Sequence, residues 1–157
     1  EILRRQPGHF QALHLSGVLA LQRGQVARSI ELLRESLQRE PRQPLAQRDL
    51  GNAFQQGGHL TEALAAYDRS LALKPDQPDL YNNRGIALTA LGRRDAALES
   101  YGRAIALKPD YAQAYNNRGT LLSGSGRAAE ALADFNQAIA LDPAYARAMI
   151  NRAGTLA

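Results

Sequence analysis

Two identical stretches of sequence, YNNRG, place paired side-chain amides at residues 81–85 and again at residues 115–119. Asparagine costs roughly 0.7 kcal/mol against alanine inside a helix, so its repeated use at one point of a helix needs a reason. A carboxamide offers a hydrogen-bond donor and an acceptor together, which is what a peptide group requires of a partner. Asn83, Asn117 and Asn151 are therefore candidates for holding a polypeptide backbone without reading its side chains.

Other kinds of site chemistry have little support in the chain. It contains no cysteine, which excludes disulfides, thiolate metal sites and cysteine nucleophiles. His9 and His14 are five residues apart, not the three or four that place two metal ligands on one helical face. Ser16 is expected to face away from His14 and Asp49, so nucleophile and base do not converge. We therefore expect no enzyme activity within these residues, no metal and no cofactor.

The amides belong to a repeat that runs through the chain. Prolines recur every 34 residues at positions 7, 41, 75, 109 and 143, and 16 of the 34 positions in residues 78–111 are identical in residues 112–145. A period of this length indicates an array of stacked repeats in one domain, residues 1–157. We expect complete repeats at 10–43, 44–77, 78–111 and 112–145, with partial repeats at 1–9 and 146–157 at the two ends of what is a piece of a longer protein.

Apolar residues within each repeat have helical spacing. Ala97, Tyr101, Ala104 and Ile105 follow the i, i+4, i+7, i+8 pattern of one buried stripe, which predicts a second helix in the repeat. A first helix precedes it, and glycine-containing turns separate the two at residues 22–25, 56–59, 91–94 and 124–127. The periodic proline ends the second helix, because it has no backbone N–H to donate. Each repeat is thus predicted to be a helical hairpin.

The repeat resembles the tetratricopeptide repeat (TPR) at its characteristic positions. In residues 78–111 these positions hold Tyr81, Gly85, Leu88, Gly92, Ala97, Tyr101, Ala104 and Pro109, and residues 44–77 and 112–145 follow the same pattern. The resemblance implies an all-α, right-handed superhelical solenoid of helix-turn-helix hairpins. It also implies that the first helices line a concave groove for peptides or partner helices. The asparagine row is similar to the one in the TPR arrays of protein O-linked N-acetylglucosamine transferases.

Candidate binding residues lie on the stripe of the first helices that is opposite their packing stripe. The peptide-binding candidates are Asn82, Asn83, Asn116, Asn117, Asn151, Asn52, Asp49, Arg48 and Thr120. An apolar end of the groove is predicted at Leu15, Val18, Leu21 and Leu45. Adjacent first helices should lie roughly 8 to 10 Å apart, too far for Asn83 and Asn117 to bond each other. Three residues of extended chain span about 10 Å, so the spacing predicts a strand-like peptide ligand.

We expect a protein or peptide partner. Nucleic acid is disfavoured, because the arginines behind the net charge of +4 are dispersed through every repeat rather than gathered in a stripe. No apolar run approaches the ~20 residues of a membrane span, so we expect no membrane partner and a cytoplasmic location. A carboxylate clamp for C-terminal tails is disfavoured, because Gln113 and Asn117 stand where that class has cations.

Three functions remain open at this stage. The first is an adaptor or scaffold that binds extended segments in the groove through an asparagine ladder. The second is the substrate-recruiting arm of a larger enzyme, such as a glycosyltransferase. The third is a structural array that forms homo-oligomers, because uncapped terminal helices would expose apolar residues such as Met149 and Leu156.

Overall fold

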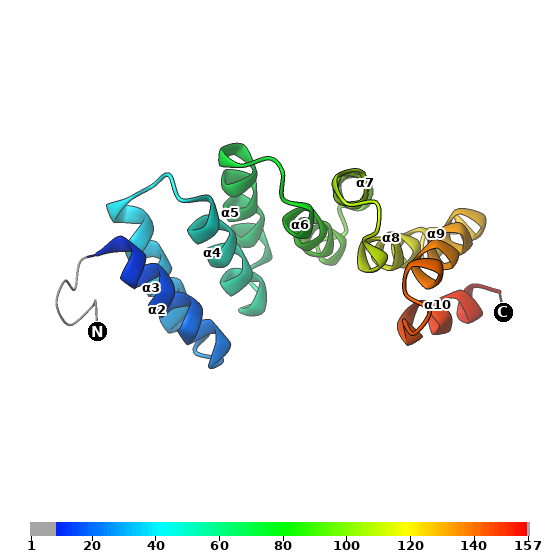
Figure 1. Cartoon of the computed structure of the whole chain (residues 1–157), viewed down its shortest axis with the longest axis horizontal. Helices are drawn as coiled ribbons and strands as arrows, with labels where there is room; N and C mark the ends of the chain where they lie inside the picture. The colour runs from blue at the N-terminus through cyan, green and yellow to red at the C-terminus, as the bar shows by residue number, and fades with distance from the viewer. Residues whose placement is uncertain (1–8, 157) are drawn as a thin grey trace. The chain divides into compact units, whose positions relative to one another are not determined.

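A computed structural model of the chain describes residues 9–156, and all regular structure in that range is helical (Figure 1). The described helices are α2 (Phe10–Gln22), α3 (Val26–Arg39), α4 (Pro44–Gln56), α5 (Leu60–Leu73), α6 (Pro78–Ala90), α7 (Arg94–Leu107), α8 (Ala112–Ser123), α9 (Ala128–Leu141) and α10 (Ala146–Leu156). The all-α prediction is confirmed for these residues. The partial repeat predicted at residues 1–9 lies almost entirely outside them.

Consecutive helices pair into hairpins, α2 with α3, α4 with α5, α6 with α7, and α8 with α9. The final helix, α10, packs against α9 and α8. The helices belong to two compact units, one up to residue 76 that holds α2 to α5 and one from residue 77 that holds α6 to α10. Within each unit the first helix of a hairpin stacks next to the first helix of the following one, so both units are short solenoids of helical hairpins.

The turn between the helices of each hairpin is set by a glycine. Gly24, Gly58, Gly92 and Gly126 have φ values of 74°, 79°, 72° and 76°. This left-handed conformation is easily reached only without a Cβ atom. At the other end of each second helix the chain leaves helical geometry ahead of the periodic proline; α7, for example, ends at Leu107, ahead of Pro109. The predicted turns and stops are confirmed.

A second glycine in each hairpin allows a large side chain to pack against the backbone of the first helix, Leu33 in the first hairpin and an aromatic ring in the other three. A Cβ atom added to Gly85 would lie 2.5 Å from Tyr101 Cε1, and one added to Gly119 would lie 2.8 Å from Phe135 Cε1. Both rings are almost completely buried, and Phe135 packs with Leu122. This close approach holds the first helix at a fixed distance from the second and so fixes the position of the groove-facing stripe.

None of the described helices is both long enough and apolar enough to cross a lipid bilayer.

Candidate functional site

The second unit contains an open groove of about 740 Å³. Its lining comes mainly from the three first helices of the unit, with Ile86 and Thr89 on α6, Asn117 and Thr120 on α8, and Asn151 on α10. All five residues lie on the stripe that helical geometry assigned to the groove. Four of the predicted binding residues line this groove: Asn116, Asn117, Thr120 and Asn151.

The paired asparagines connect neighbouring repeats. Asn117 Nδ2 donates a hydrogen bond of 3.0 Å to Asn82 Oδ1, and Asn151 Nδ2 donates one of 2.9 Å to Asn116 Oδ1. In each case the asparagine at the second position of the pair donates to the asparagine at the first position in the preceding repeat, 35 residues earlier. The first position beside Asn151 is held by Ile150. We call such a bond between first helices a rung. The rungs give the repeated asparagines a structural role, the connection of neighbouring repeats, that was not predicted from the sequence.

Two of the predicted groove residues, Asn82 and Asn116, are each only 1% exposed. Asn116 belongs to the groove lining and Asn82 does not. Each side chain accepts a hydrogen bond from the next first helix, and contact of either amide with a ligand stays a prediction. The expectation that Asn83 and Asn117 lie too far apart to bond each other stays a prediction, and the bond that Asn117 makes runs diagonally to Asn82 instead.

The orientation of the Asn151 amide follows from its second hydrogen bond. Asn151 Nδ2 lies 3.2 Å from Thr120 Oγ1, whose single hydrogen is donated to the backbone carbonyl of Asn116 at 2.8 Å. A carbonyl only accepts, so Thr120 Oγ1 must accept from Asn151. Both amide hydrogens of Asn151 are thereby used inside the protein. Its Oδ1 atom has no hydrogen-bond partner among residues 9–156 and remains an acceptor beside the groove.

The hydroxyl groups of the groove also donate their hydrogen bonds within the protein. Thr89 Oγ1 donates to the backbone carbonyl of Gly85 at 2.8 Å, so in its 3.2 Å contact with Tyr101 the tyrosine hydroxyl is the donor. Burial raises the pKa of Tyr101, which keeps the hydroxyl protonated at neutral pH. Thr89 and Thr120 therefore present their hydroxyl oxygens as acceptors, beside apolar lining residues such as Ile86 and Leu121.

Two arginines complete the groove lining, Arg94 at the start of α7 and Arg147 near the start of α10. The described lining contains no aspartate or glutamate. Neither arginine was predicted to line the groove. Arg94 lies on a second helix, outside the stripe of the first helices, and no periodic signal marks it, because Leu60 and Ala128 hold its place in neighbouring repeats. Arg147 lies four residues before Asn151 on α10, and this i, i+4 spacing is the signal that could have placed it.

The first unit has its own rung at the position two repeats earlier. His14 Nε2 lies 2.7 Å from Asp49 Oδ2, and these residues correspond in the repeat to Asn82 and Asn117. Arg48 Nε donates a further bond of 2.9 Å to Asp49 Oδ1. Burial alone would raise the pKa of Asp49, but the hydrogen bonds from His14 and Arg48 outweigh it and hold the pKa below its ordinary value. Asp49 and Arg48, both predicted to bind peptide, thus contact each other in a rung whose carboxylate is ionised at neutral pH, and their contact with a ligand stays a prediction.

Other predicted site residues are engaged inside the fold. Asn52 Oδ1 accepts a hydrogen bond of 3.0 Å from the hydroxyl of Tyr67, and Asn83 is half-buried and also makes interactions with other groups. Neither lines the groove of the second unit. In the range 9–156 no cluster of three acidic, histidine or cysteine side chains is found that could hold a metal ion.

The predicted apolar end of the groove lies in the first unit. Leu15 is 59% exposed and Leu45 47% exposed, whereas Val18 and Leu21 are partly buried. Leu19, which the prediction omitted, is also 51% exposed on α2. The exposure of these side chains leaves their role as an anchor pocket a prediction.

Comparison with protein-family models found three matches. A model described as TPR repeat matches residues 51–92 and 87–126, and two models described as tetratricopeptide repeat match residues 112–145 and residues 1–44. Together they span most of the chain. The comparison with curated protein sequences found no match.

Solved structures with the same arrangement of helices include MamA, at 26% identity and a TM-score of 0.87 over 93% of this chain and 85% of that one. TTC0263 from Thermus thermophilus has 25% identity and a TM-score of 0.77 over 98% of this chain and 84% of that one. The first TPR of Spaghetti (RPAP3), bound to the HSP90 peptide SRMEEVD, has 26% identity and a TM-score of 0.70 over 72% of this chain and 90% of that one.

Proposed function

Because the chain belongs to the tetratricopeptide repeat family, we propose that it is a protein-interaction scaffold that binds an extended polypeptide segment in the groove of its second unit. The observation that carries this proposal is the groove of about 740 Å³ with amide and hydroxyl oxygens along its floor. A polypeptide backbone presents hydrogen-bonding groups at regular intervals and suits such a floor. The likeness to a TPR that was solved with a bound peptide supports the same use of the groove.

The rungs divide the asparagines into two roles under this proposal. Asn117 and Asn151 contact the ligand, with Thr120 between them in the groove lining. Asn82 and Asn116 position those amides from behind by accepting one hydrogen bond from each. A buried acceptor that holds the donor side of an amide fixes its orientation before the ligand arrives. Such preorganisation reduces the entropy that binding would otherwise cost.

Affinity through such contacts should be moderate. A net hydrogen bond contributes about 0.5 to 1.5 kcal/mol, and ordering a flexible peptide opposes it. We expect micromolar binding at best, improving with ligands long enough to contact both amides. In a larger enzyme, for example a glycosyltransferase, the same groove would serve to recruit the substrate.

A groove-filling substitution tests this function without disturbing a rung. Ala90 is exposed and lines the groove, and it makes no side-chain hydrogen bond, so Ala90→Leu occupies groove volume alone. Ala106 is exposed on α7 outside the groove lining, which makes Ala106→Leu a matched control. Peptides selected from a random 12-residue display library on the unaltered chain should bind Ala90→Leu several-fold more weakly and Ala106→Leu equally well. Equal binding to both variants would rule out the groove.

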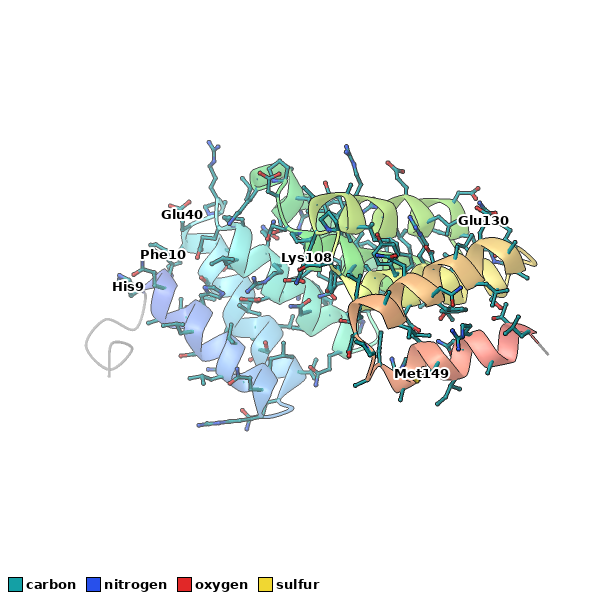
Figure 2. All side chains as sticks on the ribbon, turned by 45° about the vertical axis from the view of Figure 1, so that its right-hand side comes forward. His9, Phe10, Glu40, Lys108, Glu130 and Met149 are labelled. Carbon is teal, nitrogen blue, oxygen red and sulfur yellow. The ribbon has the colours of Figure 1, made fainter. Side chains whose placement is uncertain are left out.

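Self-association is a second candidate, favoured by the exposed side of α10. Ile150 is 70% exposed, Leu156 68% and Met149 39%. Figure 2 shows Met149 on α10. An exposed apolar surface of this kind commonly marks an interaction site. If a second copy supplies that cover, sedimentation should show a concentration-dependent dimer that Ile150→Glu dissociates. A monomer at every concentration would exclude this candidate.

A further inference from the structure

We propose that the groove of the second unit selects an acidic segment in the polyproline II conformation, with a backbone N–H turned to the groove floor at every third residue. This inference rests on the proposed function and specifies the chemistry of the ligand. Three independent features of the groove lead to it: the hydrogen-bonding state of the floor, the separation of the rungs and the charge of the lining.

The first feature is that two amide oxygens on the floor are left without a donor. Both amide hydrogens of Asn151 are bonded within the protein, and one of those of Asn117 goes to Asn82. Thr120 donates to a backbone carbonyl. The Oδ1 atoms of Asn117 and Asn151 have no partner among the described residues, so two acceptors stand one repeat apart. A ligand that satisfies them must supply hydrogens, and backbone N–H groups are the donors that every non-proline residue carries.

The second feature is the separation of these acceptors. Neighbouring packed helices lie roughly 8 to 10 Å apart, and that is the interval at which the ligand must repeat a donor. In a β-strand, backbone groups on the same side recur every second residue, at distances of about 6.6 Å and then about 13 Å. The group on the third residue, at about 10 Å, therefore faces away from the floor. A polyproline II helix has three residues per turn and rises about 3.1 Å per residue, which returns an N–H to the same side every 9.3 Å or so. The repeat distance of polyproline II matches the expected spacing of the two acceptors. The repeat distance of a β-strand, the ligand that chain length alone predicted, does not match it.

Polyproline II also makes its backbone available. The conformation has no internal hydrogen bonds, so each N–H is free to donate. Two residues of every three do not face the floor, and proline is tolerated there because its missing N–H is not needed. A segment rich in proline is already ordered before it binds, which lowers the entropic cost of association.

The third feature is charge. Arg94 and Arg147 line the groove, no acidic residue does, and neither arginine forms an ion pair with another described residue. Guanidinium groups form strong charge-assisted hydrogen bonds with carboxylates. Ligand residues that donate their N–H to the floor should therefore be accompanied by acidic side chains.

A designed peptide tests the inference directly. Four repeats of Glu-Pro-Pro form a polyproline II helix whose only backbone N–H groups lie at every third residue. Titration of the isotope-labelled chain, followed by NMR, should shift the side-chain amide signals of Asn117 and Asn151 and the backbone signal of Thr120. A peptide of the same sequence with N-methylated glutamates keeps the shape and charge but lacks the N–H groups. It should bind at least tenfold more weakly.

Six repeats of Glu-Pro, which present an N–H at every second residue, and four repeats of Gln-Pro-Pro should also bind more weakly.

Each result bears on a different claim. Equal binding of the N-methylated peptide would overturn the role of the backbone donors, equal binding of Glu-Pro would overturn the three-residue period, and equal binding of Gln-Pro-Pro would overturn the preference for acid. If no designed peptide binds while library peptides still lose affinity with Ala90→Leu, the inference fails and the proposed function stands. If Ala90→Leu has no effect on any peptide, the proposed function itself fails.

Discussion

The two units bridge their first helices at the same pair of repeat positions with different chemistry. In the first unit His14 contacts Asp49 at 2.7 Å and Arg48 adds a second bond to the carboxylate. In the second unit Asn117 donates to Asn82 at 3.0 Å, and both groups are neutral. Each bond joins residues 35 apart. The repeat therefore specifies where a polar bridge between first helices is placed. The residue types decide whether that bridge titrates and which hydrogen-bonding atoms it leaves for a ligand.

The residue that follows Asp49 or Asn117 along the chain also differs in chemistry between the two units. Leu50 in the first unit and Arg118 in the second are equivalent, and so are Ala66 and Asp134. Arg118 donates two hydrogen bonds of 2.7 Å to the carboxylate of Asp134, which is 6% exposed. The first unit fills this place with apolar contacts and the second with an ion pair, although the helical frame is the same.

Arg118→Leu should give the largest loss of stability, because it leaves the buried Asp134 without its partner. Breaking a buried ion pair costs 3 to 5 kcal/mol, and the partial exposure of Arg118 reduces our expectation to about 2 to 3 kcal/mol. Urea unfolding followed by circular dichroism measures the loss. Arg118→Leu combined with Asp134→Ala copies the chemistry of the first unit and should recover most of the stability. If the double variant is no more stable than the single one, the pair is not the cause.

Asn117→Ala should destabilise the second unit by about 1 to 3 kcal/mol, because Asn82 Oδ1 is then buried without a donor. Amide hydrogen exchange should show faster opening of α6 and α8, while α2 to α4 of the first unit keep their protection. Gln137→Ala, at an exposed position of α9, serves as the control and should change little. Unaltered protection in α6 would show that the rung contributes nothing.

Acid should weaken the rung of the first unit and not the amide rungs of the second. The pKa of Asp49 is lowered in the folded chain, so its contribution is fully present above the unfolded value of about 3.9 and is lost as pH falls through the folded pKa. Hydrogen exchange of α2 and α4 should therefore accelerate below about pH 4. Asp49→Asn should remove this part of the pH dependence, and an unchanged pH profile in that variant would contradict the assignment.

Gly102→Ala should give the smallest effect, a gain of about 0.5 to 1 kcal/mol. Gly102 lies within α7, at the position that Arg34 occupies in α3, and an added Cβ atom would meet nothing within 4 Å. Thermal unfolding measures the gain. Gly119→Ala is the contrasting control and should destabilise, because its Cβ would lie 2.8 Å from Phe135. A loss of stability in Gly102→Ala would show that α7 is more closely packed than the structure indicates.

Sequence reasoning predicted the hairpins well, because their determinants are local. The period of the prolines, the turn glycines such as Gly92 and the stripe of Ala97 and Tyr101 each report on neighbouring residues along one helix. The stripe also placed Asn117 and Asn151 on the groove, since 3.6-residue geometry fixes which side chains share a face.

The state of the asparagines could not be predicted in this way. Whether Asn82 faces a ligand or a neighbouring helix depends on the diagonal reach between two repeats, which the period of one helix does not contain. Arg94 was missed for a related reason, because it reaches the groove from a second helix, whereas Arg147 lies on the stripe of Asn151 and was within reach. The pairing of His14 with Asp49 was within reach, since both lie on the groove-facing stripe at a separation of one repeat plus one residue.

A double-mutant cycle on Asn82 and Asn117 tests the rung most directly. Asn82→Ala, Asn117→Ala and the double variant are unfolded with urea, and the coupling is the difference between the double effect and the sum of the single effects. We expect a favourable coupling of about 1 kcal/mol, since each single variant leaves the other amide without its partner. Additive effects, with no coupling beyond about 0.3 kcal/mol, would contradict the claim that paired asparagines bridge neighbouring repeats.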